Sequence, residues 1–209
     1  MEWLRTGRFL PIRAFAVLVL FSSAAEAQVA CPKGTIKRGA RPPGGSAVYC
    51  EKRLPSGKYV IHGWYYEFYE NGKIRRKIKY KLGRRNGPLF AYNIMGWKEG
   101  VMHYRDDKLH GKMVVYYASG RVHATTFYRR GLKHGQVRHW YPSGRRKMLG
   151  HYRKNKLHGK ILWWFKNGKL KMAGSMQKGK PHGLWKEWDR DGNRTSTCRY
   201  RHGRKIRCL

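Results

Sequence analysis

The sequence predicts an all-β protein: an elongated single-layer antiparallel meander of about six stacked β-hairpins. Two glycines nine residues apart recur together every 24 residues. Each 24-residue copy also holds two short apolar or aromatic runs separated by glycine turns, with no room for a helix. A fixed period of this size is typical of repeat proteins, so we expect function to lie along a surface rather than in one pocket. The two glycine columns are Gly63, Gly87, Gly111, Gly135, Gly159 and Gly183, and Gly72, Gly96, Gly120, Gly144, Gly168 and Gly192.

Residues 1–27 have the features of a cleaved export signal. Three arginines precede an uncharged span, residues 14–25, which is too short for a membrane helix of about 20 residues. Ala25 and Ala27 form a small-x-small cleavage site. A retained signal anchor is the alternative. We expect an exported chain, periplasmic or extracellular, that begins near Gln28.

Residues 28–61 do not follow the period and are interpreted as an N-terminal cap tied by a disulfide. A Pro-Pro-Gly-Gly run at 42–45 is typical of a loop. The open edge of a stacked sheet needs such protection. Acylation of Cys31 as a lipoprotein is an alternative, but residues 28–30 lack the leucine-like residue expected three places upstream. We therefore favour a chain without a lipid anchor.

The four cysteines fall as two local pairs, one near each end. An even number in an exported chain favours disulfides, and four cysteines allow three connectivities. Cys198 and Cys208 lie symmetrically about a glycine, where a hairpin turn would bring them opposite each other. We therefore favour Cys31–Cys50 and Cys198–Cys208, the latter closing the C-terminal end at residues 206–209. Zinc binding is the rival interpretation, but no C-x-x-C spacing supports it.

Residues 62–205 form the six copies, and the copy at 158–181 shows the pattern most clearly. An apolar and aromatic run at 161–165 is followed by Asn167-Gly168. Both of these residues tolerate positive φ, which predicts a two-residue hairpin loop. A second run then leads to a lysine-glycine-lysine turn into the next copy. Each copy is therefore expected to be one β-hairpin.

Three columns of apolar side chains are expected to stack neighbouring hairpins through cross-strand pairs. They lie three, six and 18 residues after the first residue of each copy. The odd spacing between the first two columns means that a bulge intervenes or that both faces of the sheet carry aromatics, and the sequence leaves this open. The columns are Tyr65, Leu89, Met113, Val137, Ile161 and Trp185; Phe68, Tyr92, Tyr116, Trp140, Trp164 and Trp188; and Tyr80, Tyr104, Tyr128, Tyr152, Met176 and Tyr200.

The pattern His-Gly-x-apolar-x-x-aromatic-aromatic-x-Asn-Gly-Lys, followed by Tyr and a further Gly, resembles the variant MORN repeat. Bacterial chains with tandem copies are often catalogued as YwqK-type antitoxins. Residues 134–156 and 158–180 fit closely. The copy that begins at Asn86 departs most, with Met95 at the turn and Trp97 in place of lysine, so we expect it to be the least regular hairpin. The resemblance implies a twisted single-layer sheet with a shallow groove, in proteins that often dimerise or act as scaffolds, and a loose link to membrane lipid.

A histidine column, His62, His110, His134, His158 and His182, has the residue type of a metal or catalytic site. Each copy contributes two strands, so equivalent positions are about 9–10 Å apart. Ligands of one zinc ion must all reach a point about 2 Å away. We therefore predict polar turn residues and no metal site. No catalytic motif occurs either, so we predict no enzyme, no catalytic residue and no cofactor.

The chain is strongly basic, with 47 Lys and Arg against 11 Asp and Glu and a formal net charge of +36. A field of this sign favours polyanions. Basic residues recur around the turns between copies at a spacing of about 10 Å, so they are only partly screened from one another. The alternative is that they keep a flat sheet soluble. The candidate anion-binding residues are Lys81, Arg105, Arg129, Arg130, Arg153, Lys154, Lys156, Lys178, Lys180 and Arg201.

We expect an exported, non-catalytic binding or scaffold protein that engages an anionic surface or an acidic partner through this basic ladder. Anionic lipid, lipopolysaccharide or an acidic protein are the partners considered, and a homodimer is left open. One alternative is an antitoxin-like protein that neutralises an acidic partner, although most toxins of paired systems act in the cytosol. The second is nucleic-acid binding through basic and aromatic residues, which export disfavours.

Overall fold

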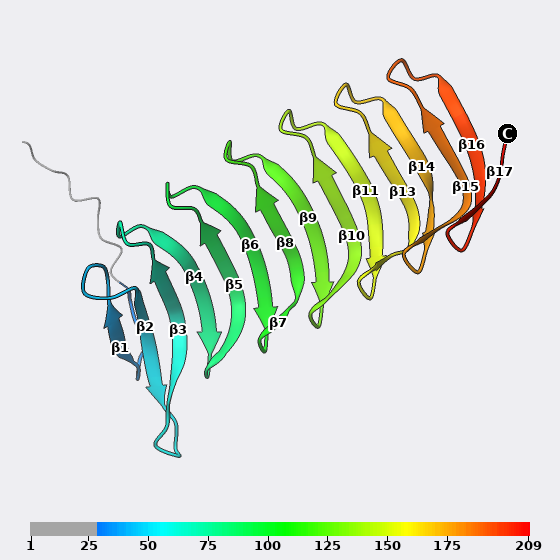
Figure 1. Ribbon diagram of the computed structural model, residues 1–209. Helices are drawn as coiled ribbons and strands as arrows, with labels where there is room; N and C mark the ends of the chain where they lie inside the picture. The colour runs from blue at the N-terminus through cyan, green and yellow to red at the C-terminus, as the bar shows by residue number, and fades with distance from the viewer. Residues whose placement is uncertain (1–28) are drawn as a thin grey trace, which may run out of the picture.

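The computed structural model describes residues 29–209, which form one antiparallel sheet without a helix (Figure 1). The described residues therefore hold no helix that could cross a membrane. The predicted cleaved signal, residues 1–27, lies outside the described residues. The strands are β1 (Ile36–Ala40), β2 (Ala47–Arg53), β3 (Tyr59–Phe68), β4 (Ile74–Lys81), β5 (Arg84–Tyr92), β6 (Lys98–Arg105), β7 (Lys108–Leu109), β8 (Gly111–Tyr116), β9 (Val122–Arg129), β10 (Leu132–Trp140), β11 (Arg146–Arg153), β12 (Lys156–Leu157), β13 (Gly159–Trp164), β14 (Leu170–Gln177), β15 (Lys180–Trp188), β16 (Arg194–Arg201) and β17 (Arg204–Cys208).

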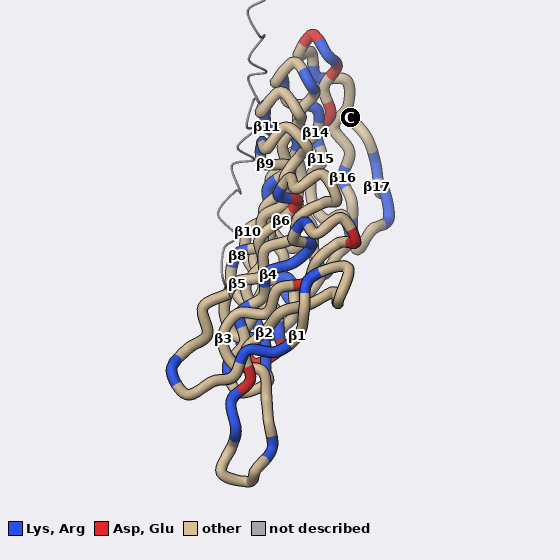
Figure 2. Tube along the Cα trace, turned by 90° about the vertical axis from the view of Figure 1, so that its left-hand side faces the viewer, with Lys and Arg blue, Asp and Glu red and all other residues tan. Residues whose placement is uncertain are grey.

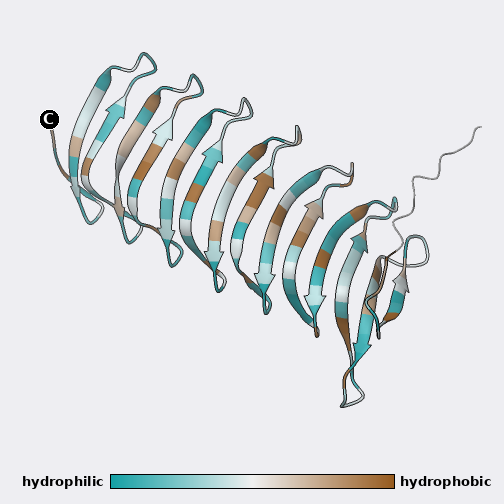
Figure 3. Cartoon of the chain, turned by 180° about the vertical axis from the view of Figure 1, so that it is seen from behind, coloured by the Kyte–Doolittle hydropathy of each residue, from teal (hydrophilic) through white to brown (hydrophobic). Residues whose placement is uncertain are grey.

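The strands follow one another as a meander, which confirms the predicted fold class. Each strand pairs with its neighbours in the chain, from β1 with β2 to β16 with β17. The short strands β7 and β12 are the first parts of strands that are interrupted at His110 and His158, because β6 pairs with both β7 and β8, and β11 with both β12 and β13. Hydrophobic and hydrophilic residues alternate along the strands (Figure 3).

The turn inside each copy differs from the predicted two-residue loop. In the fifth copy the Phe165 amide donates to the Lys169 carbonyl at 2.9 Å, which leaves three residues in the loop. Only Gly168 has positive φ, at 92°, and its amide donates to the Phe165 carbonyl at 3.0 Å. Asn167 instead uses its side chain, whose Oδ1 accepts from the Lys169 amide at 3.0 Å. A three-residue loop that ends in a left-handed glycine creates a bulge.

The odd spacing of the apolar columns reflects aromatics on both faces of the sheet, because no residue is inserted between the columns at three and six. The register shifts by one residue between Trp163 and Trp164, where the column at six begins. The same shift occurs at the equivalent place in the other copies, for example between His139 and Trp140. The extra residue of this shift lies on the second strand of the hairpin, Lys171 in the fifth copy, so the alternation along the first strand is unchanged. Trp140 accordingly lines a shallow hollow with Gln136 and Arg138, on the face opposite to Val137.

The turns that connect one copy to the next are two-residue loops in which both residues have positive φ. Lys178 and Gly179 have φ values of 51° and 84°. Positive φ at both positions is typical of the type I′ turn, whose twist matches that of the flanking strands. The Gly179 amide also donates to the Leu157 carbonyl at 2.9 Å, and the equivalent bond recurs at each connecting turn. The connecting turns are thereby tied to the start of their own copy.

The dipeptide that opens each copy, His-Gly or Asn86-Gly87, does not lie in a hairpin turn, so that expectation was wrong. It lies within a strand in four copies and at the interruption before β8 and before β13 in the other two. In the last copy Ala173 pairs with Lys186 and Ser175 pairs with His182, which leaves two extra residues on β15. Gly183 has φ of 77° within this irregularity. It stands directly opposite an aromatic residue, Tyr200. The glycine column is therefore explained by a bulge that needs positive φ.

One face of the sheet carries the best-buried side chains. Val137 and Ile161 are each 1% exposed. Their cross-strand partners within the same copy are glycines, Gly150 and Gly174. A Cβ at Gly150 would touch both Val137 and Ile161, which belong to consecutive copies. The small residue of one copy therefore makes room for the large residue of the next.

The two ends of the sheet are each tied by a disulfide in the predicted local connectivity. Cys31 is bonded to Cys50, which is fully buried. Val29, Val48 and Phe68 form a buried cluster around Cys50. At the other end, Cys198 is bonded to Cys208, its cross-strand partner on β17.

The copy that begins at Asn86 is as regular as the others, so the expectation of an irregular hairpin was wrong. Its strands β5 and β6 pair in the same register as those of the other copies. Its turn has the same bonds, with the Gly96 amide donating to the Asn93 carbonyl at 2.8 Å. Asn93 adds two bonds, because its Oδ1 accepts from the amides of Met95 and Trp97 at 3.0 and 2.9 Å. This asparagine supports the turn in place of the usual Asn-Gly pair.

Candidate functional site

The hairpin turns form two rows along the long edges of the sheet (Figure 1). We call the row of turns between copies the connecting edge, and the row of turns inside copies the intra-repeat edge. The connecting edge comprises residues 82–83, 106–107, 130–131, 154–155, 178–179 and 202–203 with the residue on each side. The intra-repeat edge comprises residues 70–72, 94–96, 118–120, 142–144, 166–168 and 190–192.

The ten predicted anion-binding residues all lie at the connecting edge. They are exposed in every case. Basic residues are also spread along the whole trace, while acidic residues are few (Figure 2). The structure therefore places the ten residues in one row, in which equivalent positions of successive copies are about 10 Å apart. The residues are Lys81, Arg105, Arg129, Arg130, Arg153, Lys154, Lys156, Lys178, Lys180 and Arg201.

The connecting edge places like charges directly opposite each other. The residue before each turn pairs across the strands with the residue after it, and in four of the six turns both are cationic. Like charges at directly opposite positions are destabilising. Arg84, Lys108 and Arg204 complete three of these pairs and were not among the ten candidates. They occupy the same position of the repeat as Lys156 and Lys180. The four pairs are Lys81 with Arg84, Arg105 with Lys108, Arg153 with Lys156, and Arg201 with Arg204.

Basic residues that directly follow the turns of the intra-repeat edge are used in a different way. Lys73 Nζ donates to the Met95 carbonyl of the next turn at 3.2 Å, and Lys169 Nζ donates to the Asp191 carbonyl at 2.6 Å. Arg121 and Arg145 also donate to the turn that follows them, but to the carbonyl of its first residue, Pro142 at 3.0 Å and Lys166 at 3.2 Å. None of the ten candidate residues forms a side-chain hydrogen bond or ion pair within residues 29–209. The cations of the connecting edge are therefore available to a ligand.

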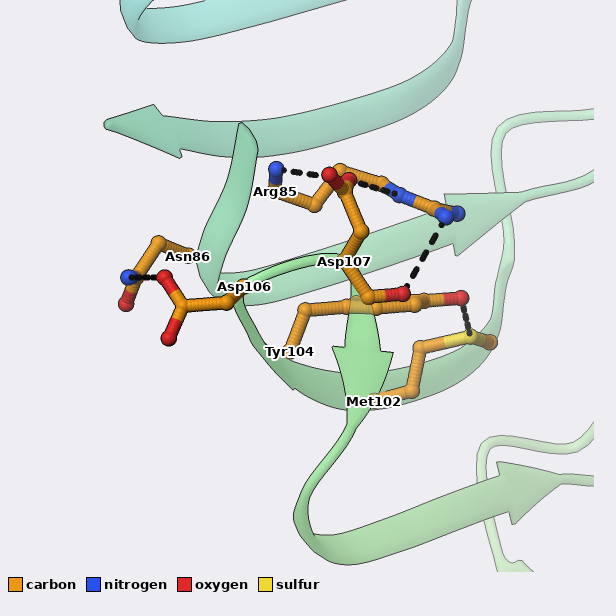
Figure 4. Close-up of polar contacts among 6 residues, drawn as sticks. All are labelled: Arg85, Asn86, Met102, Tyr104, Asp106 and Asp107. Carbon is orange, nitrogen blue, oxygen red and sulfur yellow. Dashed lines mark hydrogen bonds and ion pairs between the residues drawn. The ribbon is translucent and has the colours of Figure 1, made fainter. Parts of the chain in front are cut away.

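The second connecting turn interrupts the basic edge with two acids, Asp106 and Asp107 (Figure 4). Asp107 Oδ1 accepts from the Arg85 amide at 3.0 Å and from Arg85 Nε at 3.1 Å. The bond from the Arg85 amide is the main reason that the pKa of Asp107 is lowered, and the Arg85 side chain adds to it. Asp106 Oδ1 accepts from Asn86 Nδ2 at 3.3 Å. Asn86, which stands where the other copies have histidine, thus supplies a hydrogen-bond donor to Asp106.

Arg85, one residue outside the connecting edge, is the cation that Asp107 engages. Its guanidinium lies 4.4 Å from the centre of the Tyr104 ring, and Nη2 donates to the Asp107 carbonyl at 3.3 Å. Tyr104 in turn donates to Met102 Sδ at 3.6 Å. Sequence reasoning missed this cluster. The only indication in the sequence was the pair of acids at 106–107. Four of the other five connecting turns have glycine at the position of Asp107.

The histidine column does not converge in the structure. Within residues 29–209 no group of three or more His, Cys, Asp or Glu side chains is placed to hold a metal ion. Partial burial lowers the pKa of His62, and its Nδ1 accepts from the Leu82 amide at 3.3 Å. His182 and His202 form a ring pair 5.3 Å apart, and the buried Nδ1 of His182 has no partner. Each histidine therefore lies beside the connecting turn of its own copy.

Comparison with known proteins identifies the repeat. The family model described as the MORN repeat variant matches residues 61–82 and 157–178, which are the first and fifth copies. No curated protein matches the chain. Among solved structures, one described as the crystal structure of the GtfA/B complex bound to UDP and GlcNAc matches with 13% identity and a TM-score of 0.25. That match covers 71% of this chain but only 25% of the other, so this chain spans about a quarter of its length.

The remaining copies have the same strands, turns and glycine positions as the two matched segments. The narrower relation to YwqK-type antitoxins stays a prediction. Residues 61–82 and 157–178 are therefore similar to the MORN repeat variant, and the other copies share their fold.

Proposed function

We propose that the chain is an exported, non-catalytic binding or scaffold protein that engages an anionic surface or an acidic partner along its connecting edge. The observation that carries this proposal is the set of like-charged cross-strand pairs at four connecting turns. Such pairs cost stability in the free protein. A bound polyanion would remove this cost, because each of its charges attracts both members of a pair.

The spacing of the edge supports an extended ligand. Equivalent cations are separated by about 10 Å, so no compact ion can contact more than one copy. A polymer, a membrane surface or an acidic protein presents several charges over that distance. The absence of side-chain partners for the ten residues within the described chain means that binding would not break existing bonds.

Export is supported by the two disulfides, because such bonds persist in oxidising compartments. The features of residues 1–27 support it independently. Export also favours an envelope surface or secreted partner over nucleic acid and over a cytosolic toxin.

The test compares two variants that lose the same charge at different places. In the edge variant, Lys81, Arg105, Arg153 and Arg201 are replaced by Gln, the residue that Gln177 supplies in the same slot. In the control variant, Lys112, Arg138, Lys160 and Lys186 are replaced by Gln. These four cations are exposed on a face of the sheet and have no cationic cross-strand partner.

The probes are phosphatidylglycerol vesicles and polyglutamate, each at low and at high salt. We expect the affinity for the probe to fall at least about tenfold further in the edge variant than in the control variant. We also expect the affinity of the edge variant to depend less on salt. Binding to vesicles alone would favour an anionic surface, and binding to polyglutamate alone would favour an acidic protein. Equal losses in both variants would show non-specific attraction and contradict the proposal.

A further inference from the structure

The turn of the second copy, residues 93–97, exposes three large apolar side chains. Ile94, Met95 and Trp97 are 53%, 61% and 51% exposed. No other copy has a large apolar residue at any of these positions. The equivalent residues are Glu70, Asn71 and Lys73; Ala118, Ser119 and Arg121; Pro142, Ser143 and Arg145; Lys166, Asn167 and Lys169; and Arg190, Asp191 and Asn193.

Nearly all backbone polar groups of this turn are hydrogen-bonded within the protein. The amides of Met95 and Trp97 donate to Asn93 Oδ1, and the Gly96 amide donates to the Asn93 carbonyl. The Trp97 carbonyl accepts from the Asn93 amide at 2.9 Å.

The two carbonyls at the tip are bonded to the neighbouring copy. Ile94 O accepts from Asn71 Nδ2 and Met95 O accepts from Lys73 Nζ, both at 3.2 Å. Unsatisfied backbone groups are the main obstacle to placing a turn in a lipid environment. In this turn that obstacle is largely removed before any contact with lipid.

The size and chemistry of the tip indicate what it binds. Three side chains on one turn provide far less than the roughly 800 Å² per partner that a stable protein interface buries. The turn carries no acidic residue, and exposed Lys98 follows it directly. A tryptophan beside a lysine at the end of an element is typical of the membrane–water interface. We propose that residues 93–97 insert into the interfacial region of a lipid bilayer and anchor the protein there.

This anchor is independent of the connecting edge. The tip belongs to the intra-repeat edge, at the opposite end of the hairpins (Figure 1). Its attraction to lipid is hydrophobic, so it needs no anionic headgroup and withstands salt. Binding by the connecting edge is electrostatic and weakens with salt. The two proposals therefore fail or succeed separately.

The first experiment measures flotation of the full chain with phosphatidylcholine vesicles in about 1 M salt, where charges are screened within about 3 Å. The variant combines Ile94→Ala, Met95→Ser and Trp97→Asn, residues that Ala118, Ser119 and Asn193 supply in the same turn of other copies. It changes no charge and keeps Asn93 and Gly96. We expect its partition into vesicles to fall more than about tenfold. Equal flotation of both proteins would overturn the proposal.

The second experiment locates Trp97 directly and does not depend on the triple variant folding. Vesicles with brominated acyl chains quench tryptophans that enter the bilayer. The conservative variant Trp97→Phe keeps an apolar tip, so we expect it to bind while losing part of the quenched emission. The difference from the unchanged chain isolates Trp97, because every other tryptophan, including any in residues 1–28, is common to both proteins. The same quenching in both proteins would show that Trp97 stays outside the bilayer and would overturn the proposal.

Discussion

At the scale of single residues, the packing of this sheet depends on glycines that make room for large side chains. The Trp185 ring lies over Gly174 of the preceding copy, where a Cβ would overlap the ring atoms. Trp185 is 7% exposed, and its Nε1 donates to the Ser175 carbonyl at 3.1 Å. Its ring centre also lies 5.9 Å from that of Trp163. A single missing Cβ therefore allows the fifth and sixth copies to pack closely.

The substitution Gly174→Ala is expected to lower the free energy of unfolding by about 1–3 kcal/mol, because the ring or the strand must shift. The measurement is urea unfolding followed by tryptophan fluorescence. Gly150→Ala is the matched control, since its Cβ would meet Ile161 at an ordinary contact distance of 3.4 Å. Neither glycine has positive φ, so backbone strain does not enter the comparison. Equal losses at the two positions would contradict the steric explanation.

At the scale of the hairpin, the sequence predicted the element but not all of its register. The 24-residue period and paired apolar runs correctly placed two strands in each copy. Asn167-Gly168 is compatible with both a two-residue and a three-residue loop, because Asn also supports a turn through its side chain. The choice depends on which residues pair across the strands, such as Trp164 with Leu170. That is a property of the folded sheet and is not visible in the dipeptide.

The contact between Arg85 and Asp107 was hidden for a related reason. The two residues are separated by 22 positions and meet only when one connecting turn lies beside the start of its own copy. The basic ladder, in contrast, could be placed from the period alone, because residues in one slot must recur at one edge of a regular meander. What the period could not show was that the slots before and after a turn are direct cross-strand partners.

The connecting turns carry cations where the backbone does not favour them. Lys178 has φ of 51°, a left-handed conformation that costs a side-chain-bearing residue about 1 kcal/mol. Asn tolerates this conformation and is preferred at this position of a type I′ turn. Lys154 and Arg130 have the same strain in neighbouring turns. The sequence therefore keeps positive charge at the tips of turns that another residue would suit better.

The substitution Lys178→Asn is expected to raise the free energy of unfolding by about 0.5–1 kcal/mol while weakening polyanion binding. Thermal unfolding and the polyglutamate assay measure the two effects on one protein. Lys180→Asn removes the same charge from an extended residue of β15, where Asn gains nothing. If both variants were stabilised equally, relief of charge repulsion rather than backbone strain would be the cause.

At the scale of the whole molecule, six similar copies add their charges along one open sheet. Four like-charged cross-strand pairs lie at the connecting edge, and within residues 29–209 the only ion pair that involves a residue of this edge is Arg85–Asp107. Each like-charged pair is expected to cost about 0.2–1 kcal/mol. The single-layer sheet leaves these residues exposed, so dissolved ions can screen them. The stability of the free protein should therefore depend on salt in the direction opposite to that of a protein held by surface ion pairs.

We expect the free energy of unfolding to rise between about 0.01 M and 1 M sodium chloride, as the Debye length falls from about 30 Å to about 3 Å. Urea unfolding at each salt concentration measures this. The edge variant breaks all four pairs, so it should be on the order of 1–2 kcal/mol more stable than the unchanged chain at low salt and respond less to salt. The control variant loses the same net charge but no like-charged pair, so it corrects for general self-repulsion and for effects of salt on apolar burial. A salt response that is unchanged in the edge variant would place the repulsion elsewhere and remove the main physical reason for assigning polyanion binding to the connecting edge.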